Sequence, residues 1–269
     1  MLIDLHVHSP ATPGCTLQPA QVLARAAERG LDGVAFTDLN SLSAAQALLA
    51  MGQGGPAVGH DTKLAVFVGV ELRTDHGHYL AFFADPTKVP EPAQLFGAGG
   101  GKPWPTREVL ERVTELGGVA VAALPYDRDI DYPSGDYIFG LKAHLVAVEG
   151  LNAQQRPGTN DLAVEASGHL GVSCVGGSSA TSLAEVGQAA TCFADSFSTH
   201  AELVAALKSG RFFPVGAGHP PPLTDLARAP RLTAERFERS DRGGRDRGDR
   251  GGRDRRGGRG GRRGGRSSR

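Results

Sequence analysis

The sequence predicts an α/β barrel followed by a low-complexity tail. Short apolar runs rich in β-branched residues alternate along the chain with amphipathic stretches of helical length. Single buried strands separated by helices favour a parallel sheet, and so many units favour a closed barrel over an open sheet. From residue 240 onward only Arg, Gly, Asp and Ser occur. That composition cannot build a core, so it marks a disordered tail.

The first half of the chain supplies four of the expected strands: Leu2–His8, Gly33–Asp38, Leu64–Glu71 and Tyr79–Ala84. The helix Pro19–Arg29 follows the first strand, because proline suits the first turn of a helix and the glycine after Arg29 suits a C-terminal cap. A second helical stretch, Leu42–Met51, follows the second strand. Two segments rich in Gly and Pro are expected to be loops: Gly54–Asp61 and Val89–Pro105.

The second half continues the alternation. Its expected strands are Val119–Leu124, Leu145–Glu149, Val172–Gly176 and Thr191–Ala194. Its expected helices are Glu108–Leu116, Asp161–Leu170 and Ala201–Lys208. The last helix begins with a capping box from Thr199 to Glu202 and ends at Gly210. In such barrels, chemistry takes place where strands end and loops begin.

Several classes of protein are excluded by composition. The sequence has no run of about 18 apolar residues, so we expect no transmembrane helix and no membrane partner. The N-terminal residues Met1–Leu5 carry no basic region followed by a long apolar stretch, so we expect no secretory signal. Cys15, Cys174 and Cys192 are an odd number of widely spaced cysteines. They favour reduced thiols in a cytoplasmic protein.

The formal net charge of zero conceals two different segments. Residues 239–269 hold 13 Arg and 4 Asp, which gives this tail a charge of +9. The rest of the chain therefore has 16 basic and 25 acidic residues, a charge of −9. We expect a barrel domain at 1–222, a linker at 223–238 and the tail at 239–269.

Seven short motifs stand at or near the ends of expected strands: Asp4–Ser9, Gly30–Asn40, Gly69–Leu72, Gly77–Leu80, Val119–Pro125, Val148–Asn152 and Gly176–Thr181. In this order they resemble the motifs of the PHP (polymerase and histidinol phosphatase) family, across roughly residues 1–215. The resemblance implies a distorted (β/α)7 TIM-like barrel. It also implies a cluster of up to three metal ions used for phosphoester hydrolysis.

Four positions depart from the family pattern. Leu39, Leu124 and Thr181 stand where the resemblance implies histidine, and Ser179 stands where it implies aspartate. Leucine cannot bind a metal, and the hydroxyl groups are poor substitutes. These positions are therefore interpreted as lost ligands.

The metal ligands that remain are expected to be His6, His8, Glu71 and His78. They could hold one divalent ion, Zn, Mn or Fe. In the alternative, no metal is held and the histidines are relics hydrogen-bonded at the barrel mouth.

Other polar residues near strand ends have two interpretations. Asp38 could orient a ligand histidine, but capping of the following helix is the expectation. Arg128 and Arg156 could bind a phosphate, but are expected to be ordinary surface arginines. Glu149 and Asn152 are expected to be structural rather than supports for the metal ligands.

The tail resembles the RGG boxes of RNA-binding proteins. Its repeated arginines are expected to contact RNA or single-stranded nucleic acid by phosphate pairing and stacking. They include Arg242, Arg245, Arg250, Arg253, Arg256, Arg259, Arg262, Arg263 and Arg266. The tail contains no Phe or Tyr. It could instead be a solubilising segment or fold back on the acidic barrel.

Three functions remain open from the sequence. The leading hypothesis is a degenerate PHP protein that binds RNA or single-stranded nucleic acid through its tail, with hydrolysis lost or reduced. The second is a working metal-dependent phosphoesterase or nuclease with a one-metal site. The third is an inactive barrel that assembles with a protein partner.

Overall fold

The computed structural model describes residues 1–43, 48, 64–97 and 102–216. Most of the expected helix Leu42–Met51, the expected loop Gly54–Asp61, the linker and the tail therefore lie outside the described residues. The chain divides into two units, Met1–Leu232 and Thr233–Arg269. All described residues belong to the first unit.

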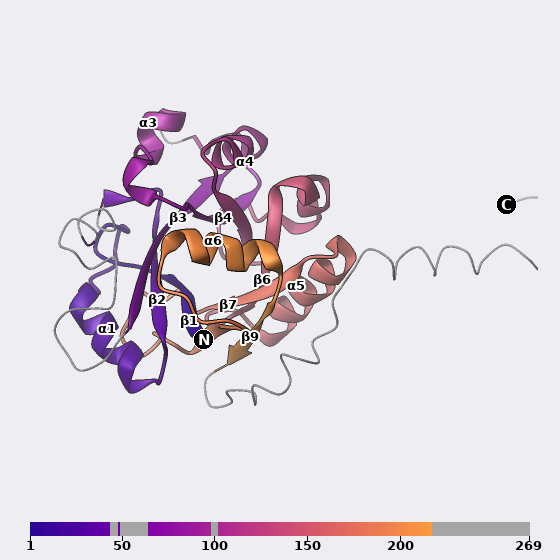
Figure 1. The fold of residues 1–269 in the computed structure, drawn as a ribbon. Helices are drawn as coiled ribbons and strands as arrows, with labels where there is room; N and C mark the ends of the chain where they lie inside the picture. The colour runs from indigo at the N-terminus through magenta and orange to yellow at the C-terminus, as the bar shows by residue number, and fades with distance from the viewer. Residues whose placement is uncertain (44–47, 49–63, 98–101, 217–269) are drawn as a thin grey trace, which may run out of the picture. The chain divides into compact units, whose positions relative to one another are not determined.

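Nine strands form one sheet in the described part of the chain (Figure 1). They are β1 (Leu2–Val7), β2 (Gly33–Leu39), β3 (Ala65–Thr74), β4 (Gly77–Phe82), β5 (Val119–Ala123), β6 (Leu145–Asn152), β7 (Ser173–Gly177), β8 (Ala189–Phe193) and β9 (Phe212–Gly216). Their order is β7-β6-β5-β4-β3-β2-β1-β8-β9. Six of these strands run parallel to a neighbour, in the pairs β1–β2, β2–β3, β5–β6 and β6–β7. Strands β4 and β8 run antiparallel to both of their neighbours. The sheet is thus mixed rather than purely parallel.

The sheet curls until β7 meets β8. The hydroxyl of Thr191 on β8 donates to the carbonyl of Gly176 on β7 and accepts from the amide of the same glycine, both at 2.9 Å. A further parallel bridge joins Val7, at the end of β1, to Ala180 beyond β7. The sheet is therefore nearly closed, and the predicted α/β barrel is confirmed.

The described helices connect the strands at the expected places. They are α1 (Pro19–Glu28), α3 (Pro92–Phe96), α4 (Thr106–Glu115), α5 (Pro157–Leu170) and α6 (His200–Ser209), with 3-10 helices η1 (Pro86–Lys88) and η2 (Gly135–His144). The capping box of α6 forms as predicted, with Gly210 in the left-handed conformation at its end. Helix α3 lies inside the stretch that was expected to be a loop. Helix η2 and strand β9 were not anticipated.

Alternate residues of β3 face opposite sides of the sheet, as strand geometry requires. Val68, Val70 and Leu72 pack outward in one cluster with the residues of α4. Phe67 faces inward and packs with Leu80 and other residues of the barrel interior. By the same alternation, the polar residues near the end of β3 at positions 71 and 73 face the interior, at the barrel mouth.

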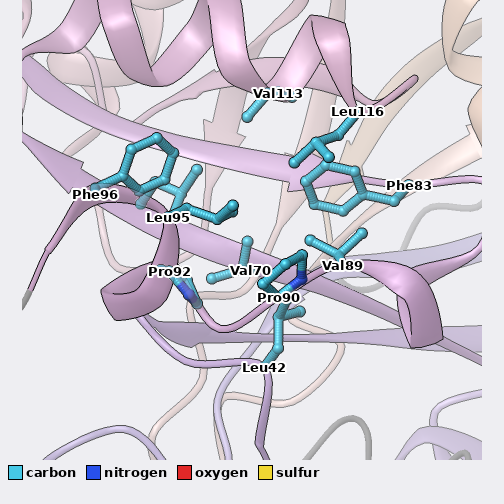
Figure 2. A pocket seen from close by; sticks show the side chains of 11 residues that line it. Leu42, Val70, Phe83, Val89, Pro90, Pro92, Leu95, Phe96, Val113 and Leu116 are labelled. Carbon is cyan, nitrogen blue, oxygen red and sulfur yellow. The ribbon is translucent and has the colours of Figure 1, made fainter.

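A small apolar hollow lies outside the barrel, between α3, α4 and the outer face of β3. Figure 2 shows Val70, Phe96 and Val113 among the side chains around it. All the residues that line it are apolar. It offers no ligand for a metal or phosphate, so the chemistry has to be sought at the barrel mouth.

None of the helices in the described ranges combines the length and the apolar character that crossing a membrane would require.

Candidate metal centre

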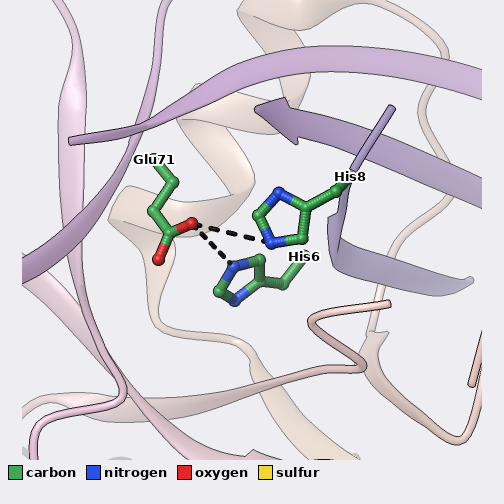
Figure 3. Close-up of side chains that lie close together, drawn as sticks. All are labelled: His6, His8 and Glu71. Atoms are coloured by element: carbon green, nitrogen blue, oxygen red, sulfur yellow. Dashed lines mark ion pairs between the residues drawn. The ribbon is translucent and has the colours of Figure 1, made fainter. Parts of the chain in front are cut away.

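Three side chains meet at the barrel mouth: His6 near the end of β1, His8 just beyond it, and Glu71 near the end of β3 (Figure 3). All three are buried. The Nε2 atoms of His6 and His8 both point at Oε2 of Glu71, at 3.5 Å and 3.6 Å. Three of the four residues predicted as ligands therefore lie together.

The spacing of these three atoms fits a metal ion. The two separations are too long for good hydrogen bonds. Ligands about 2.0–2.2 Å from a tetrahedral ion stand roughly 3.4 Å apart, close to the observed 3.5 Å and 3.6 Å. Two imidazole nitrogens and a carboxylate oxygen are suitable ligands for Zn²⁺, Mn²⁺ or Fe²⁺. The residues present therefore fit a single divalent ion.

The ring of His6 is held by a carboxylate 143 residues away. Its Nδ1 donates to Oε1 of Glu149 at 2.9 Å, while the other oxygen of Glu149 accepts from the amide of Leu124 at 3.2 Å. This leaves Nε2 of His6 facing Glu71, buried and without a hydrogen-bond partner among the described residues. Metal-binding histidines commonly donate their other nitrogen to a carboxylate in this way. Glu149, expected to be structural, thus orients a candidate ligand.

Electrostatics around His6 favour a positive charge at the cluster. Burial lowers the pKa of His6, but the carboxylates of Glu149 and Glu71 outweigh that effect and raise it to about 10. Burial would raise the pKa of Glu71, yet His6 and His78 hold it well below its usual range. For His8, burial dominates and lowers the pKa. The site therefore combines the anionic carboxylate of Glu71 with the neutral imidazole of His8.

A hydroxyl group fixes the ring of His8. Thr12 donates its proton to Oδ1 of Asp38 at 2.8 Å, so its oxygen is an acceptor toward Nδ1 of His8 at 3.1 Å. The nitrogen that faces Glu71 is then the one without a proton in the neutral ring. Asp38 also accepts from the amide and hydroxyl of Ser9, both at 2.6 Å. Capping was the expectation for Asp38, but the structure places it in the network that orients His8.

Replacing Thr12 with valine is expected to weaken metal binding about 10- to 100-fold, the range typical for loss of a group that supports a ligand. Valine matches the shape of threonine but cannot accept from Nδ1 of His8. Thr12→Ser is the matched control, because it keeps the hydroxyl and should bind within a few-fold of the unmodified chain. The metal affinity of both variants is measured by competition with a fluorescent chelator. Equal affinity in Thr12→Val would mean that the hydroxyl has no part in orienting His8.

His78 contacts the cluster differently from the other three. Its Nδ1 donates to Oε1 of Glu71 at 2.7 Å, the oxygen that does not face His6 and His8. Its Nε2 is buried and has no hydrogen-bond partner in the described ranges. His78 thus supports Glu71 from behind and lies outside the group of three.

Asp4 and Gly177 set the position of the strand that carries His6. Asp4 accepts from the amides of Ser178 and Gly187, both at 2.9 Å, and so ties β1 to the chain after β7. Burial raises the pKa of Asp4 to about 6. A Cβ at Gly177 would lie 2.5 Å from Cβ of His6 and 2.8 Å from Oε1 of Glu149. Glycine is required at this position because the two strands meet so closely beside the site.

The four positions interpreted as lost ligands differ in their surroundings. Leu39 pairs with Glu71 across β2 and β3. Leu124 is buried, and its φ of 49° lies in the left-handed region, as does that of Ser179 at 50°. Thr181 is exposed, and its amide and hydroxyl both donate to Glu185.

The remaining arginine candidates stay apart from the cluster. Arg128 and Arg156 are exposed, in keeping with ordinary surface arginines. The nine arginines of the tail lie outside the described residues.

Three residues that support the site were not expected or were expected to have another role: Thr12, Asp38 and Glu149. Thr12 is four residues from His8, in a loop without a regular pattern. Glu149 comes from β6, and no local pattern links it to His6. Asp38 was expected to cap a helix, and only the fold shows its contacts with Ser9 and Thr12.

A barrel with a histidine–carboxylate cluster at the ends of its strands belongs to a class that commonly binds metal. Residues 157–212 match the family model of the PHP-associated domain. Over 175 residues the chain is 28% identical to the uncharacterized protein MJ1587 of Methanocaldococcus jannaschii, covering 61% of this chain and 90% of that protein.

One solved structure supports this fold. PsfC from Pseudomonas syringae PB-5123 aligns with a TM-score of 0.59 at 16% identity, covering 84% of this chain and 96% of that chain. An amidohydrolase from Chromobacterium violaceum, with bound SO4 and no metal, aligns at 0.48 and 18% identity, over 87% of this chain and 99% of that chain. At these identities the likeness is one of fold alone. The match over residues 157–212 supports the resemblance of the chain to the PHP family.

Proposed function

We propose that the barrel holds one divalent metal ion and is a phosphoesterase relative with reduced hydrolytic activity. The observation that supports it is the convergence of two Nε2 atoms on one oxygen of Glu71, at the spacing of metal ligands. His6, His8 and Glu71 would hold the ion, which would act as a Lewis acid toward a phosphate oxygen. Glu149 and Thr12 orient the two histidines.

Reduced rather than full activity follows from the missing ligands. Two-metal phosphoesterases stabilise the attacking and the leaving oxygen together. Leu39 and Leu124 stand beside Glu71 and Glu149 with side chains that cannot bind a second ion. His78 alone is too few donors for one. The donors in the described part of the chain therefore favour a site for one ion over a site for two.

Metal content of the purified full-length chain tests this proposal. We expect about one equivalent of Zn, Mn or Fe by plasma mass spectrometry, since three or four N/O ligands make a complete single site. His6→Ala should lose it, together with any turnover of a phosphodiester in added Mn²⁺. His169→Ala, which alters an exposed histidine, is the control. The proposal would be contradicted if the unmodified chain held no more metal than the buffer, or if His6→Ala held as much metal as the unmodified chain.

A second function is supported by the composition of residues 239–269. With 13 Arg against 4 Asp, this tail carries the charge to bind RNA or single-stranded nucleic acid. We infer that nucleic acid is the partner of the tail, while the barrel acts independently. An inactive assembly subunit would be the better description if neither metal nor nucleic acid binds.

The cytoplasmic location stays a prediction, in keeping with three cysteines that form no disulfide.

A further inference from the structure

We propose that Arg73 is the phosphate-binding residue of this site and that the substrate is a phosphomonoester. The proposal rests on the proposed function and names its substrate class. Arg73 lies on β3 two residues after Glu71, so both side chains leave the same face of the strand. It pairs directly with His78 on β4. The side chain of Arg73 thus leaves β3 on the face that carries the candidate metal centre.

The backbone of Arg73 is held in place by Asn40, which directly follows β2. The amide of Arg73 donates to Oδ1 of Asn40 at 2.8 Å, and the amide of Asn40 donates to the carbonyl of Glu71 at 2.7 Å. Asn40 has a φ of 55°, a conformation that asparagine tolerates better than most residues. The two hydrogen bonds fix Arg73 relative to Glu71, as a binding residue requires.

The guanidinium of Arg73 is weakly engaged. Its ion pair in the described part of the chain is with Asp131, at 3.7 Å, and the two side chains are 34% and 75% exposed. A pair so long and so exposed contributes little. A cation beside a metal ion is unfavourable unless an anion lies between them. Arg73 is therefore available to an anionic group of a substrate bound at the metal.

The donor pattern of arginine indicates the kind of phosphate. A guanidinium group binds two oxygens of one phosphate through parallel N–H groups. An ion on the cluster would take a further oxygen. A phosphomonoester has three non-bridging oxygens for these contacts, whereas a phosphodiester has two. The combination of one metal ion and one clamped arginine therefore suits a monoester.

Calorimetric titration of the full-length chain with inorganic phosphate tests the proposal, with and without Mn²⁺. Arg73→Gln should weaken phosphate binding about 10- to 100-fold, the usual effect of losing charge-assisted hydrogen bonds, and should leave metal content unchanged. Arg73→Lys should be intermediate, because it keeps the charge but loses the fork. Asp131→Asn should tighten binding about twofold, since it removes a weak competitor. A purely structural role of Arg73 would not produce that gain.

The controls separate this proposal from the proposed function. Arg112→Gln alters an exposed helical arginine paired with Glu115 and should bind phosphate like the unmodified chain. If the chain holds no metal, the Arg73-dependent part of phosphate binding is still measurable, so the two proposals fail separately. Equal phosphate affinity in Arg73→Gln and the unmodified chain would overturn the assignment of Arg73. Dimethyl phosphate that binds as tightly as phosphate and depends equally on Arg73 would overturn the monoester.

Discussion

Replacing Leu39 and Leu124 together with histidine is expected to give the barrel a second metal ion and about a hundredfold faster phosphoester hydrolysis. A second Lewis acid contributes several kcal/mol of transition-state stabilisation, and each 1.36 kcal/mol is a factor of ten in rate. The expected metal content rises from about one to about two equivalents per chain.

The surroundings of the two leucines make this gain plausible in physical terms. A side chain at position 39 lies across from Glu71 in the β2–β3 register. His78 offers a buried Nε2 without a hydrogen-bond partner in the described ranges. Leu124 holds a left-handed φ of 49° that histidine and asparagine adopt more readily than leucine. The backbone at position 124 thus already has the conformation that a histidine would use.

The measurement is metal content by plasma mass spectrometry, followed by hydrolysis of p-nitrophenyl phosphate. Leu39→Asn with Leu124→Asn is the matched control, because it introduces comparable polarity without imidazole. The prediction fails if the histidine variant stays folded, by circular dichroism, and still binds a single ion. In that case the missing donors at positions 179 and 181 would be the limiting ones.

Removing residues 239–269 is expected to reduce the affinity of the full chain for single-stranded RNA at least about a hundredfold in low salt, because phosphate contacts supply most non-specific binding. The logarithm of the affinity should fall steeply with the logarithm of the salt concentration for the full chain. For the truncated chain the salt dependence should be slight, since its remaining charge is −9. Metal content and thermal unfolding of the barrel should not change.

Fluorescence anisotropy with a labelled oligonucleotide at several salt concentrations measures both chains. A full-length variant with the nine arginines of the tail named above replaced by lysine is the control. It keeps the charge but loses bidentate contacts and stacking, so an intermediate affinity is expected. If the truncated chain binds as tightly as the full chain, the tail is not the nucleic-acid site.

Local patterns were sufficient for most of the barrel. Within the described residues, the expected strands and helices lie within a few residues of those observed, because each has an apolar period and clear end signals. Strand β9 was missed because Pro214 interrupts its apolar run, and proline normally argues against a strand. Pro214 lies opposite Thr191 of β8, and the side chain of Thr191 is hydrogen-bonded to Gly176.

The candidate site could be predicted only in part. His6 and His8 form a recognisable pair, and the family motifs supplied Glu71 and His78. The contacts that orient the two histidines could not be assigned, because Glu149 reaches His6 from 143 residues away. Such contacts depend on the closure of the barrel and leave no periodic trace in the sequence. The strained backbone of Leu124 likewise becomes visible only in three dimensions.

The position of β1 has a consequence for how the protein is made. This strand pairs with β2 on one side and with β8 on the other, where Leu2 lies opposite Cys192. At a synthesis rate of about 5–20 residues per second, β8 leaves the ribosome roughly 10–40 seconds after β1. The two histidines therefore emerge well before β8, and their strand cannot complete its hydrogen bonds until most of the barrel exists. The proposed metal site can therefore be completed only late in the maturation of this protein.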